Sequence, residues 1–426
     1  MPTPRDPRAL LRELFDAALE SADPLRVVPP HLPKPPKGRT VVLGAGKAAA
    51  AMAKAVEQNW QGPLSGLVVT RYGHGLPLTK IEVVEAAHPV PDAAGQAAAQ
   101  RILDAARGLT RDDLVLCLIS GGASALLALP APGVSLDDKR AVTRDLLKSG
   151  ATIFELNCVR KHLSAIKGGR LAAAAFPAQV ETLAISDVPR DDPSVIGSGP
   201  TVADPSTFAE ARAILEKYAI APPPSVTRHL AEAKDETPKP GDKRLAGARY
   251  RLVATPRMAL EAAAQLAKKR GVTPVDLGDA LEGEARELAV VQAGVARDLA
   301  AGRGAARPPA VLLSGGETTV TVKGKGKGGR NGEFALALAL ALEGAPGIFA
   351  LSCGTDGSDG TEDNAGAMIG PDTLARAAAL GLDLKRFLAD NDSWSAFRAL
   401  DDLVVTGPTR TNVNDFRAVL VLKEDR

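Results

Sequence analysis

Residues 40–58, TVVLGAGKAAAAMAKAVEQ, pass from a β-branched run through a glycine-rich turn into an alanine-rich run. This order predicts a buried strand, a tight turn and a helix. Residues 113–130, DLVLCLISGGASALLALP, repeat the same order. Residues 66–73 are predicted to form another strand, and 182–201 a strand that runs into a long polar loop. Strands that alternate with helices indicate βαβ units, so we predict a Rossmann-like parallel sheet.

The second half of the chain is also expected to be α/β. Residues 221–244, between the halves, are rich in proline and in charged residues, which is typical of a crossing between domains. We therefore predict two domains, residues 1–240 and residues 241–426. Strands are expected in 250–256, 272–278, 310–322 and 417–424, and helices over 8–22, from 256 and around 283–302.

Composition excludes several classes of protein. The 426 residues are too many for one ordinary core, and 52 basic against 50 acidic residues leave a net charge of only +2. With 3% aromatic residues as well, a nucleic-acid partner is not expected. No apolar run has the length of a membrane span or the form of a signal peptide, so we expect a cytoplasmic protein with no membrane partner. The three cysteines are far apart and are predicted to be buried free thiols.

The turn GAGKAA (44–49) fits the dinucleotide-type pattern GxGxxA. Gly44 and Gly46 would let backbone N–H groups approach a phosphate, and a phosphate would offset the unfavourable position of Lys47 at a helix N-terminus. The alternative is an exposed first-turn lysine. An NAD site also needs an acid at the end of the next strand, but that strand ends in Thr70 and Arg71. This weakens the prediction of an NAD site, whereas an NADP site stays open because an arginine can hold the extra phosphate. The GK[ST] ending of a Walker loop is absent.

A second turn, ISGGAS (119–124), places Ser120, Gly121, Gly122 and Ser124 between a strand and a helix. Free N–H groups there would face an anion, unless the turn only reverses the chain. The tripeptide Ser-Gly-Gly is expected to turn again at 314–316. Residues 156–174 are read as one helix-like segment that puts Arg160, Lys167 and Arg170 on one face, either as a wall for phosphate or carboxylate or as a solvated surface.

Two acidic stretches follow predicted strands. Asp187 lies just past a strand end, where it would bind Mg²⁺, accept a proton from a hydroxyl, or simply cap a turn. Residues 353–368 carry Asp356, Asp359, Glu362 and Asp363 in a glycine-rich loop that would hold a metal or ribose hydroxyls, or be a solvated turn.

Residues 322–344, VKGKGKGGRNGEFALALALALEG, join a β-type run to an apolar helix. We interpret the glycines and lysines as a mobile tip after a hairpin-like strand, which closes onto Gly328–Gly329 and the helix start. Arg330 is the residue expected to face a phosphate. Lys323, Lys325 and Lys327 are expected to be solvated.

Taken in order, seven stretches resemble the class-II glycerate kinases, the glycerate 2-kinase family with a C-terminal MOFRL domain. They cover about residues 40 to 422 and are VVLGAGKAA, CLISGGASALL, LNCVRKHLSAIKGGRLA, ISDVPRDDPSVIGSGPT, SGGETTVTVKGKGKGGRN, GTDGSDGTEDNAGA and TGPTRTNVNDFRAVLV. Two positions depart from the family pattern. Gly332 stands where a glutamine is common, which puts in doubt any contact made by that side chain, and Arg410 stands where glycine is frequent.

The resemblance implies two three-layer α/β domains, the second with a mixed sheet, and an active site in the cleft between them. It implies transfer of the ATP γ-phosphoryl group to the 2-hydroxyl of D-glycerate with Mg²⁺, giving 2-phosphoglycerate and ADP. Which half binds ATP stays open, and the protein is expected to be a monomer or a homodimer. The expected site residues are Lys47, Asp187 and Arg330 for catalysis; Gly44, Gly46, Ser120, Gly121, Gly122, Ser124, Arg160 and Lys167 for phosphate or substrate; Gly315, Gly316, Asn331 and Asp356 for nucleotide; and Asp187 and Asp356 for metal.

Two other functions remain open from the sequence. An NAD(P)H-dependent hydroxypyruvate reductase is supported by the GxGxxA turn and Arg71, although the chain has nothing like the arginine and histidine–acid relay of 2-hydroxyacid dehydrogenases. A sugar- or nucleotide-binding regulator would bind ATP tightly without turning over any small hydroxy acid.

Overall fold

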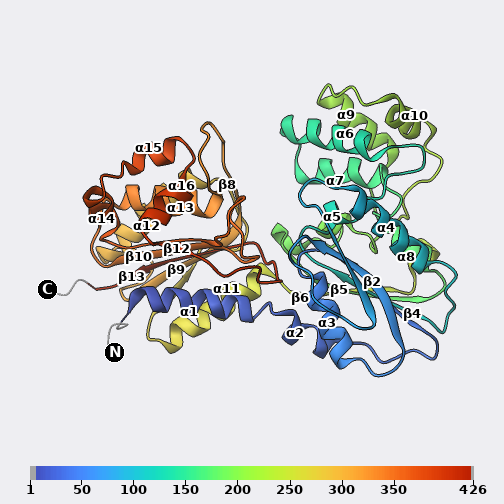
Figure 1. Cartoon of the computed structure of the whole chain (residues 1–426), viewed down its shortest axis with the longest axis horizontal. Coiled ribbons are helices and arrows are strands. Elements are labelled where there is room, and N and C mark those ends of the chain that lie inside the picture. The colour runs from blue at the N-terminus through green and yellow to red at the C-terminus, as the bar shows by residue number, and fades with distance from the viewer. Residues whose placement is uncertain (1–5, 424–426) are drawn as a thin grey trace. The chain divides into compact units, whose positions relative to one another are not determined.

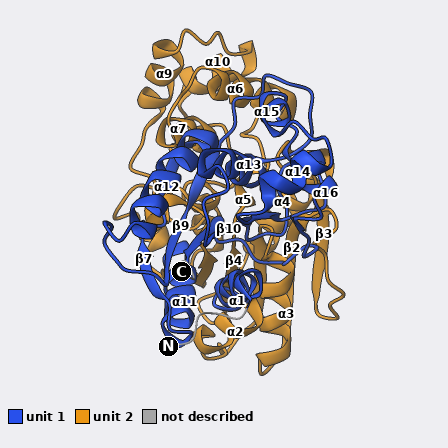
Figure 2. Cartoon of the chain, turned by 90° about the vertical axis from the view of Figure 1, so that its left-hand side faces the viewer, with its two compact units in different colours: residues 1–23, 254–426 blue, residues 24–253 orange. Residues whose placement is uncertain are grey.

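The computed structural model describes residues 6–423, and contacts divide the chain into two compact units. Unit 2 is one continuous segment, residues 24–253, and unit 1 combines residues 1–23 with residues 254–426 (Figure 2). The chain therefore starts in unit 1, passes through all of unit 2 and returns to unit 1.

Unit 2 is built on a sheet whose order is β3-β2-β1-β4-β5-β6 within the described residues. The pairs from β3 through β5 are all parallel, and β6 lies at the edge beside β5. This is the order of a Rossmann sheet, as the sequence predicts. The strands are β1 (Thr40–Ala45), β2 (Leu64–Arg71), β3 (Ile81–Ala86), β4 (Leu114–Ile119), β5 (Gln179–Ile185) and β6 (Ala248–Ala254).

Helices cover both faces of this sheet. Leu43 and Cys117 point to the face where Ile102 of α4 completes a buried cluster, while the alternate residue Val42 is also fully buried, on the face contacted by α3. A further helical group, α6, α7, α9 and α10, has its own apolar cluster and gathers at one end of the unit (Figure 1). The helices are α2 (Pro24–Val27), α3 (Ala49–Asn59), α4 (Ala93–Ala106), α5 (Ala123–Leu126), α6 (Leu136–Lys148), α7 (Ile153–His162), α8 (Arg170–Ala175), α9 (Phe208–Lys217) and α10 (Pro224–Glu232).

Unit 1 contains a mixed sheet in the order β12-β11-β10-β13-β9-β7, with β8 paired to β9. The pairs from β12 to β9 are antiparallel, whereas β7 and β8 run parallel to β9. The strands are β7 (Thr273–Asp276), β8 (Leu281–Glu284), β9 (Ala310–Thr319), β10 (Ile348–Gly354), β11 (Gly366–Ile369), β12 (Leu403–Val404) and β13 (Asp415–Val421).

Helices again form a layer on each side of the sheet in unit 1 (Figure 1). One layer contains α1 (Pro7–Glu20) and α11 (Pro256–Lys269), which pack on each other and on the central strands. The other contains α12 (Ala285–Ala300), α13 (Arg330–Leu342), α14 (Thr373–Ala379), α15 (Leu384–Ala389) and α16 (Ser393–Ala399). The predicted three-layer α/β architecture is therefore confirmed in both units.

The units differ from the expected domain boundaries in two places. The segment 221–244 lies inside unit 2, because α10 buries Val226 and Leu230 against its helical group and the chain must still add β6 to the sheet. The crossing falls at Val253–Ala254, not at 240–241. Helix α1 belongs to unit 1, since Phe15 is fully buried with its ring 5.8 Å from that of Phe416.

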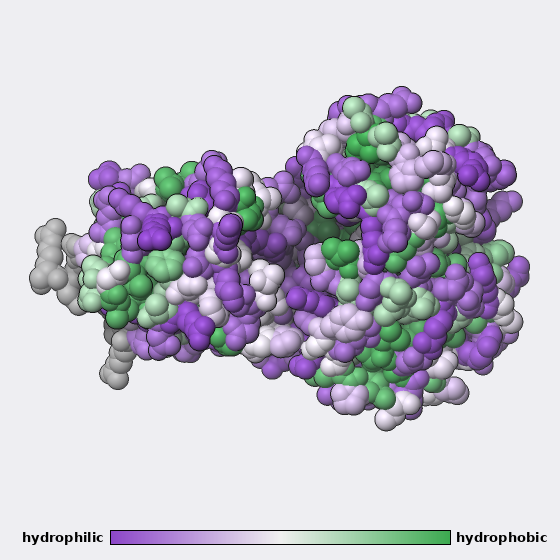
Figure 3. Space-filling model, turned by 45° about the horizontal axis from the view of Figure 1, so that its top comes forward, coloured by the Kyte–Doolittle hydropathy of each residue, from purple (hydrophilic) through white to green (hydrophobic). Residues whose placement is uncertain are grey.

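The predicted state of the cysteines is confirmed. Cys117, Cys158 and Cys353 are free and buried, as predicted. Hydrophilic residues and smaller apolar areas alternate over the face seen in Figure 3. In the described part of the chain no helix combines the length and the apolar character that crossing a bilayer requires.

Candidate functional site

Three loops of unit 2 follow neighbouring strands at the carboxyl edge of the parallel sheet. Lys47 follows β1, Gly121 and Gly122 follow β4, and Asp187 follows β5. The chain continues from β1 towards β2 on one side, while β4 lies on the other side, so the strand order reverses between β1 and β4. Ligands of open α/β sheets bind at such a reversal, outside the carboxyl ends of the strands. This edge is therefore the candidate site of unit 2.

The backbone of the β1 turn is closed by internal hydrogen bonds. The N–H of Gly46 donates to Val69 O (3.0 Å), that of Lys47 to Gly121 O (2.8 Å), and that of Ala48 to Ser120 Oγ (3.0 Å). A dinucleotide turn needs such N–H groups for its pyrophosphate. The expectation that they face a phosphate is therefore wrong for residues 46 to 48.

The glycines of this turn have a steric reason. A Cβ on Gly44 would lie 2.2 Å from Leu118 O, and one on Gly46 would lie 2.1 Å from Ser120 Oγ. Gly46 also has a φ of +133°, which favours glycine. Ser120 is fully buried, and its hydroxyl accepts the Ala48 N–H, so it fastens the two loops together. Any contact of these three residues with a ligand stays a prediction.

The β4 turn has the open backbone that the β1 turn lacks. Among the hydrogen bonds of residues 6–423, none uses the N–H of Gly121 or Gly122. Gly122 has a φ of +84°, and a Cβ there would lie 3.0 Å from Nε2 of His88 and 3.6 Å from Cγ of Lys47. Two N–H groups, a lysine and a histidine thus meet at the switch point. Sequence reasoning gave His88 no role, because its place beside Lys47 depends on the loop after β3.

A polar chain extends from the β4 turn. Ser124 Oγ lies 2.7 Å from Ser198 Oγ, and Ser198 donates to Asn157 Oδ1 (2.9 Å). The ammonium of Lys167 donates to Ser124 O (2.7 Å) and approaches Ser124 Oγ (3.4 Å). Lys167 and Ser124, predicted separately from two motifs, are therefore in direct contact.

The loop after β5 has an unusual backbone. Arg190, Asp191 and Ser198 all have φ between 55° and 68°, although none is glycine. Residues other than glycine are held in this region at a cost of about 1–3 kcal/mol each, and such strain is concentrated at functional sites. Asp187 begins this loop. Burial raises the pKa of the Tyr250 hydroxyl, and the negative charge of Asp187 nearby contributes to the same rise. The loop therefore supports a functional role for the Asp187 region.

The basic segment 156–174 is not one helix. Helix α7 ends at His162, α8 begins at Arg170, and Lys167 lies on the connection. Most of its basic residues have acidic partners: Lys161 pairs with Asp204 (3.3 Å), His162 with Glu236 (2.8 Å) and Arg170 with Asp235. Lys167 is 1% exposed, so the alternative of a solvated face is wrong for it.

Unit 1 holds a second group of candidate residues around Arg330. Nε of Arg330 lies 2.9 and 2.8 Å from the two oxygens of Asp415, and Nη1 lies 3.0 Å from Glu317 Oε1. Burial alone would lower the pKa of Arg330, but Asp415 and Glu317 raise it above its ordinary value. The guanidinium is thus a permanent cation with a fixed orientation and a side chain that is 34% exposed.

Asp359 and Asn331 hold this group at the start of α13. Asp359 accepts the N–H groups of Asn331 (2.9 Å) and Gly332 (2.7 Å), and burial raises its pKa to about 6. Asn331 is 1% exposed, and its amide donates to Asp415 Oδ1 (2.9 Å). These contacts position Asp415, which the sequence did not single out. A nucleotide contact of Asn331 stays a prediction.

The absence of a side chain at 332 has a local cause. A Cβ on Gly332 would lie 2.6 Å from Ser393 Oγ and 3.1 Å from Asp359 Oδ2. The space that a glutamine would enter is therefore occupied. Arg410, the other departure from the family pattern, has a φ of +57°, a conformation that favours glycine.

The Gly/Lys stretch before Arg330, expected to be a mobile tip, is held along its length by hydrogen bonds. Asn391 Oδ1 accepts the N–H groups of Lys323 (2.8 Å) and Gly324 (3.0 Å), and Asp392 Oδ1 accepts that of Lys327 (2.9 Å). A Cβ on Gly324 would lie 2.2 Å from Asp390 O, so glycine permits this close contact. The three lysines are exposed, as predicted.

The remaining predicted residues of unit 1 lie in ordered backbone. Gly315 and Gly316 are inside β9, so the expected turn at 314–316 is wrong; a Cβ on Gly316 would lie 2.2 Å from Leu281 O of β8. Asp356 accepts the Ser358 N–H at Oδ1 (3.0 Å), as a turn cap does. Nucleotide contacts of all three residues stay predictions.

No three His, Cys, Asp or Glu side chains form a metal-binding group in the described chain. Magnesium in phosphoryl-transfer sites keeps several waters and uses one or two carboxylates beside the substrate phosphates. Asp187, a carboxylate at the carboxyl edge of the sheet, fits that requirement.

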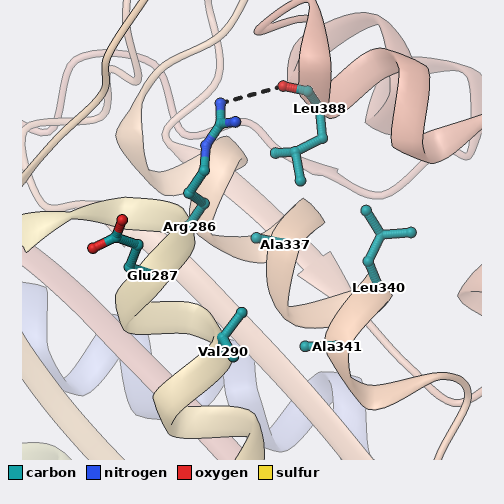
Figure 4. Close-up of a pocket in the computed structure, with 7 residues that line it drawn as sticks. All are labelled: Arg286, Glu287, Val290, Ala337, Leu340, Ala341 and Leu388. Carbon is teal, nitrogen blue, oxygen red and sulfur yellow. Dashed lines mark hydrogen bonds between the residues drawn. The ribbon is translucent and has the colours of Figure 1, made fainter.

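A groove of about 530 Å³ in unit 1 lies between α12, α13 and α15 (Figure 4). Apolar side chains line most of it, and Arg286 donates to Leu388 O (3.3 Å) at one end. None of the predicted site residues lines it.

Comparisons with known proteins cover nearly the whole chain. The model of a domain of unknown function, DUF4147, matches residues 10–231, and the MOFRL family matches residues 310–415. The D-glycerate 2-kinase of Thermotoga maritima is 41% identical over 98% of this chain and 100% of its own. A protein of Agrobacterium vitis with the provisional name hydroxypyruvate reductase is 56% identical over 97% of this chain and 94% of its own. The crystal structure of glycerate kinase from Thermotoga maritima matches with a TM-score of 0.88 and 40% identity, covering 98% of this chain and 100% of that one.

Proposed function

Because the chain belongs to the glycerate kinase family with DUF4147 and MOFRL domains, we propose that it transfers the γ-phosphoryl group of ATP to the 2-hydroxyl of D-glycerate. The products are 2-phosphoglycerate and ADP. The observation that carries the proposal is the 41% identity to a D-glycerate 2-kinase along the full length of both chains. The open N–H groups of Gly121 and Gly122 beside Lys47 support it, since phosphoryl transfer depends on positive charge placed around the moving group.

Each predicted catalytic residue has a role in this reaction. Lys47 neutralises charge on the transferring group at the switch point of unit 2. Asp187 orients the acceptor hydroxyl or accepts its proton. Arg330 supplies a second cation, whose orientation is fixed by Asp415, Glu317 and Asn414 and whose charge attracts the phosphate oxygens.

The remaining predicted residues have supporting roles. Arg160, Lys167 and Ser124 bind the acceptor, and Gly315, Gly316, Asn331 and Asp356 contact the nucleotide. Asp187 would also hold a magnesium ion, which supplies charge neutralisation on the β- and γ-phosphates when it is bound.

The experiment is an assay of purified protein with D-glycerate and MgATP, followed by ADP release. ³¹P NMR of the product distinguishes the 2-phosphate from the 3-phosphate. ADP release that requires D-glycerate, together with a 2-phosphate signal, supports the proposal. No D-glycerate-dependent ADP release would refute it.

The alternative, reduction of hydroxypyruvate, is favoured by the name of the relative that is 56% identical. The backbone of the β1 turn disfavours it, because the N–H groups of residues 46 to 48 are already bonded within the protein. The strand β2 also ends at Arg71 without an acid for the ribose hydroxyls. Oxidation of NADPH or NADH by hydroxypyruvate, in the same preparation, tests this alternative directly.

A further inference from the structure

Three basic side chains of unit 2 come from neighbouring elements, act electrostatically on one another and have no acidic partner within the described residues. They are Lys139 on α6, Arg160 on α7 and Lys167 on the loop after α7. No ion pair among the described residues includes any of them, whereas their sequence neighbours Lys161 and Arg170 both have carboxylates. We call Lys139, Arg160 and Lys167 the cationic cluster.

Lys139 is the least satisfied member. It is 7% exposed, and its ammonium is buried without a hydrogen-bond partner. Lys167 is 1% exposed, and its ammonium contacts only the carbonyl and hydroxyl of Ser124. A buried charge without a partner costs several kcal/mol, so such groups usually pair or lose their charge.

The pKa values of the cluster reflect this strain. Burial, and then the charge of Arg160, lower the pKa of Lys139 to about 7. Burial, and then Lys139 and Arg160, lower the pKa of Lys167 well below its ordinary value. An anion placed among the three side chains would relieve both effects at once.

The cluster is connected to the candidate site. Lys167 donates to the carbonyl of Ser124, which is two residues after Gly122 and its open N–H group. Unit 2 therefore offers two adjacent anion sites, one at Lys47 with Gly121 and Gly122, and one at the cluster. In D-glycerate the carboxylate is bonded to the carbon that carries the 2-hydroxyl. When that hydroxyl lies at the site of Lys47, Gly121 and Gly122, beside the phosphoryl group, the carboxylate is a second anion close by.

We propose that the cationic cluster binds the carboxylate of the three-carbon acid acceptor, with Lys139 as the residue that distinguishes an acid from a neutral analogue. The Lys139 ammonium is buried, so a small planar anion fits beside it better than the larger phosphate chain of a nucleoside triphosphate. This inference rests on the proposed function for the identity of the acid. Sequence reasoning missed Lys139, although its spacing to the buried Val142 and Leu146 places all three on one face of α6.

The test compares the binding of D-glycerate with that of D-glyceramide, its neutral amide, by titration calorimetry without nucleotide. The variant Lys139→Met keeps a side chain of similar length without the charge. Lys148→Met, an exposed position on the same helix, is the matched control. Wild type and control are expected to prefer the acid by at least about thirtyfold, since leaving a buried charge without its partner costs 2 kcal/mol or more.

Lys139→Met is expected to lose most of this preference while its Tm stays equal or rises, because an apolar side chain replaces a buried unpaired charge. The proposal is overturned if Lys139→Met keeps the preference, if acid and amide weaken equally, or if wild type does not bind D-glycerate. A lowered Tm with unchanged binding would make Lys139 a structural residue. The measurement needs no turnover, so a protein that binds the acid in this way but releases no ADP would refute only the kinase proposal.

Discussion

Lys47 is the residue on which the kinase proposal depends most. Its backbone is fixed by the bond to Gly121, so substitution removes the ammonium without opening the turn. We expect Lys47→Ala to lower kcat by about 10²–10³-fold, the usual effect of removing one group that stabilises transition-state charge. Steady-state kinetics with D-glycerate and MgATP measure it, with Lys54→Ala on the following helix, α3, as control. Near-normal kcat with an unchanged circular dichroism spectrum would remove Lys47 from the catalytic set.

Gly332 gives a second prediction, which concerns stability. Because Ser393 Oγ occupies the position of a side chain at 332, Gly332→Gln is expected to destabilise the protein by about 1–3 kcal/mol through overpacking. Removing the hydroxyl with Ser393→Ala in the same protein should recover part of this loss. Urea unfolding of the two single variants and the double variant measures the coupling. Strictly additive effects on the free energy of unfolding would show that the Ser393 hydroxyl is not the reason why glycine occupies position 332.

Asp113 predicts a pH dependence. It accepts the N–H groups of Arg39 and Thr110, each at 2.7 Å, and these bonds lower its pKa from 3.8 to about 2. Its ionised form therefore stabilises the fold above pH 3.8, and this contribution is lost as the pH falls through about 2.

The comparison with Asp113→Asn isolates the effect. Near neutral pH, we expect the free energy of unfolding of wild type to exceed that of the variant by about 2 kcal/mol, since hydrogen bonds to charged groups contribute this much. The difference should shrink as the pH falls below 3.8, as followed by urea unfolding. A difference independent of pH would contradict the prediction.

At the scale of elements, the loop before Arg330 shows where sequence patterns stop being informative. Glycine and lysine alternate there, which is typical of a flexible linker. The loop is nevertheless held by residues 390–392, more than sixty positions later in the chain. No local pattern encodes that pairing, because the glycines serve a close approach that only the folded chain reveals.

Asn391 allows this loop to be tested. Its side chain accepts the N–H groups of Lys323 and Gly324, and its φ of +54° would strain an alanine. Asn391→Gly therefore removes the side chain without adding backbone strain. We expect amide hydrogen exchange at Lys323 and Gly324 to accelerate about tenfold or more, as two hydrogen bonds of about 1 kcal/mol are lost. Unchanged exchange at both amides would show that other contacts hold the loop.

The elements around the β1 turn show how far the sequence could be interpreted. Apolar runs and glycines were enough to predict β1, β4 and their helices, since these signals are local. Whether the N–H group of a turn is free depends on contacts with other parts of the chain. The N–H of Lys47 donates to Gly121 O in the loop after β4, whereas the N–H of Gly122 has no acceptor in the described chain. Lys139 was missed for the same reason, because its burial results from the packing of α6 on other helices.

At the scale of the whole molecule, one unit is formed by segments from both ends of the chain. Helix α1 comes first, yet Leu11, Leu14 and Phe15 are fully buried in the unit formed by the last residues. An amphipathic pattern predicts such a helix but carries no information on which sheet it covers. The expected boundary after residue 240 therefore assigned α1 to the wrong set of strands.

This arrangement predicts how fragments behave. Residues 24–253 are continuous and contain a complete sheet with both helix layers, so this fragment is expected to unfold cooperatively by itself. Residues 254–426 lack α1 and would expose the apolar face that Phe15 covers, at about 1.5–3 kcal/mol for each large side chain left without its partner. Adding a synthetic peptide of residues 6–23 should raise the Tm of that second fragment. A scrambled peptide of the same composition is the control, and a Tm that responds equally to both peptides, or to neither, would show that α1 is dispensable for the fold of unit 1.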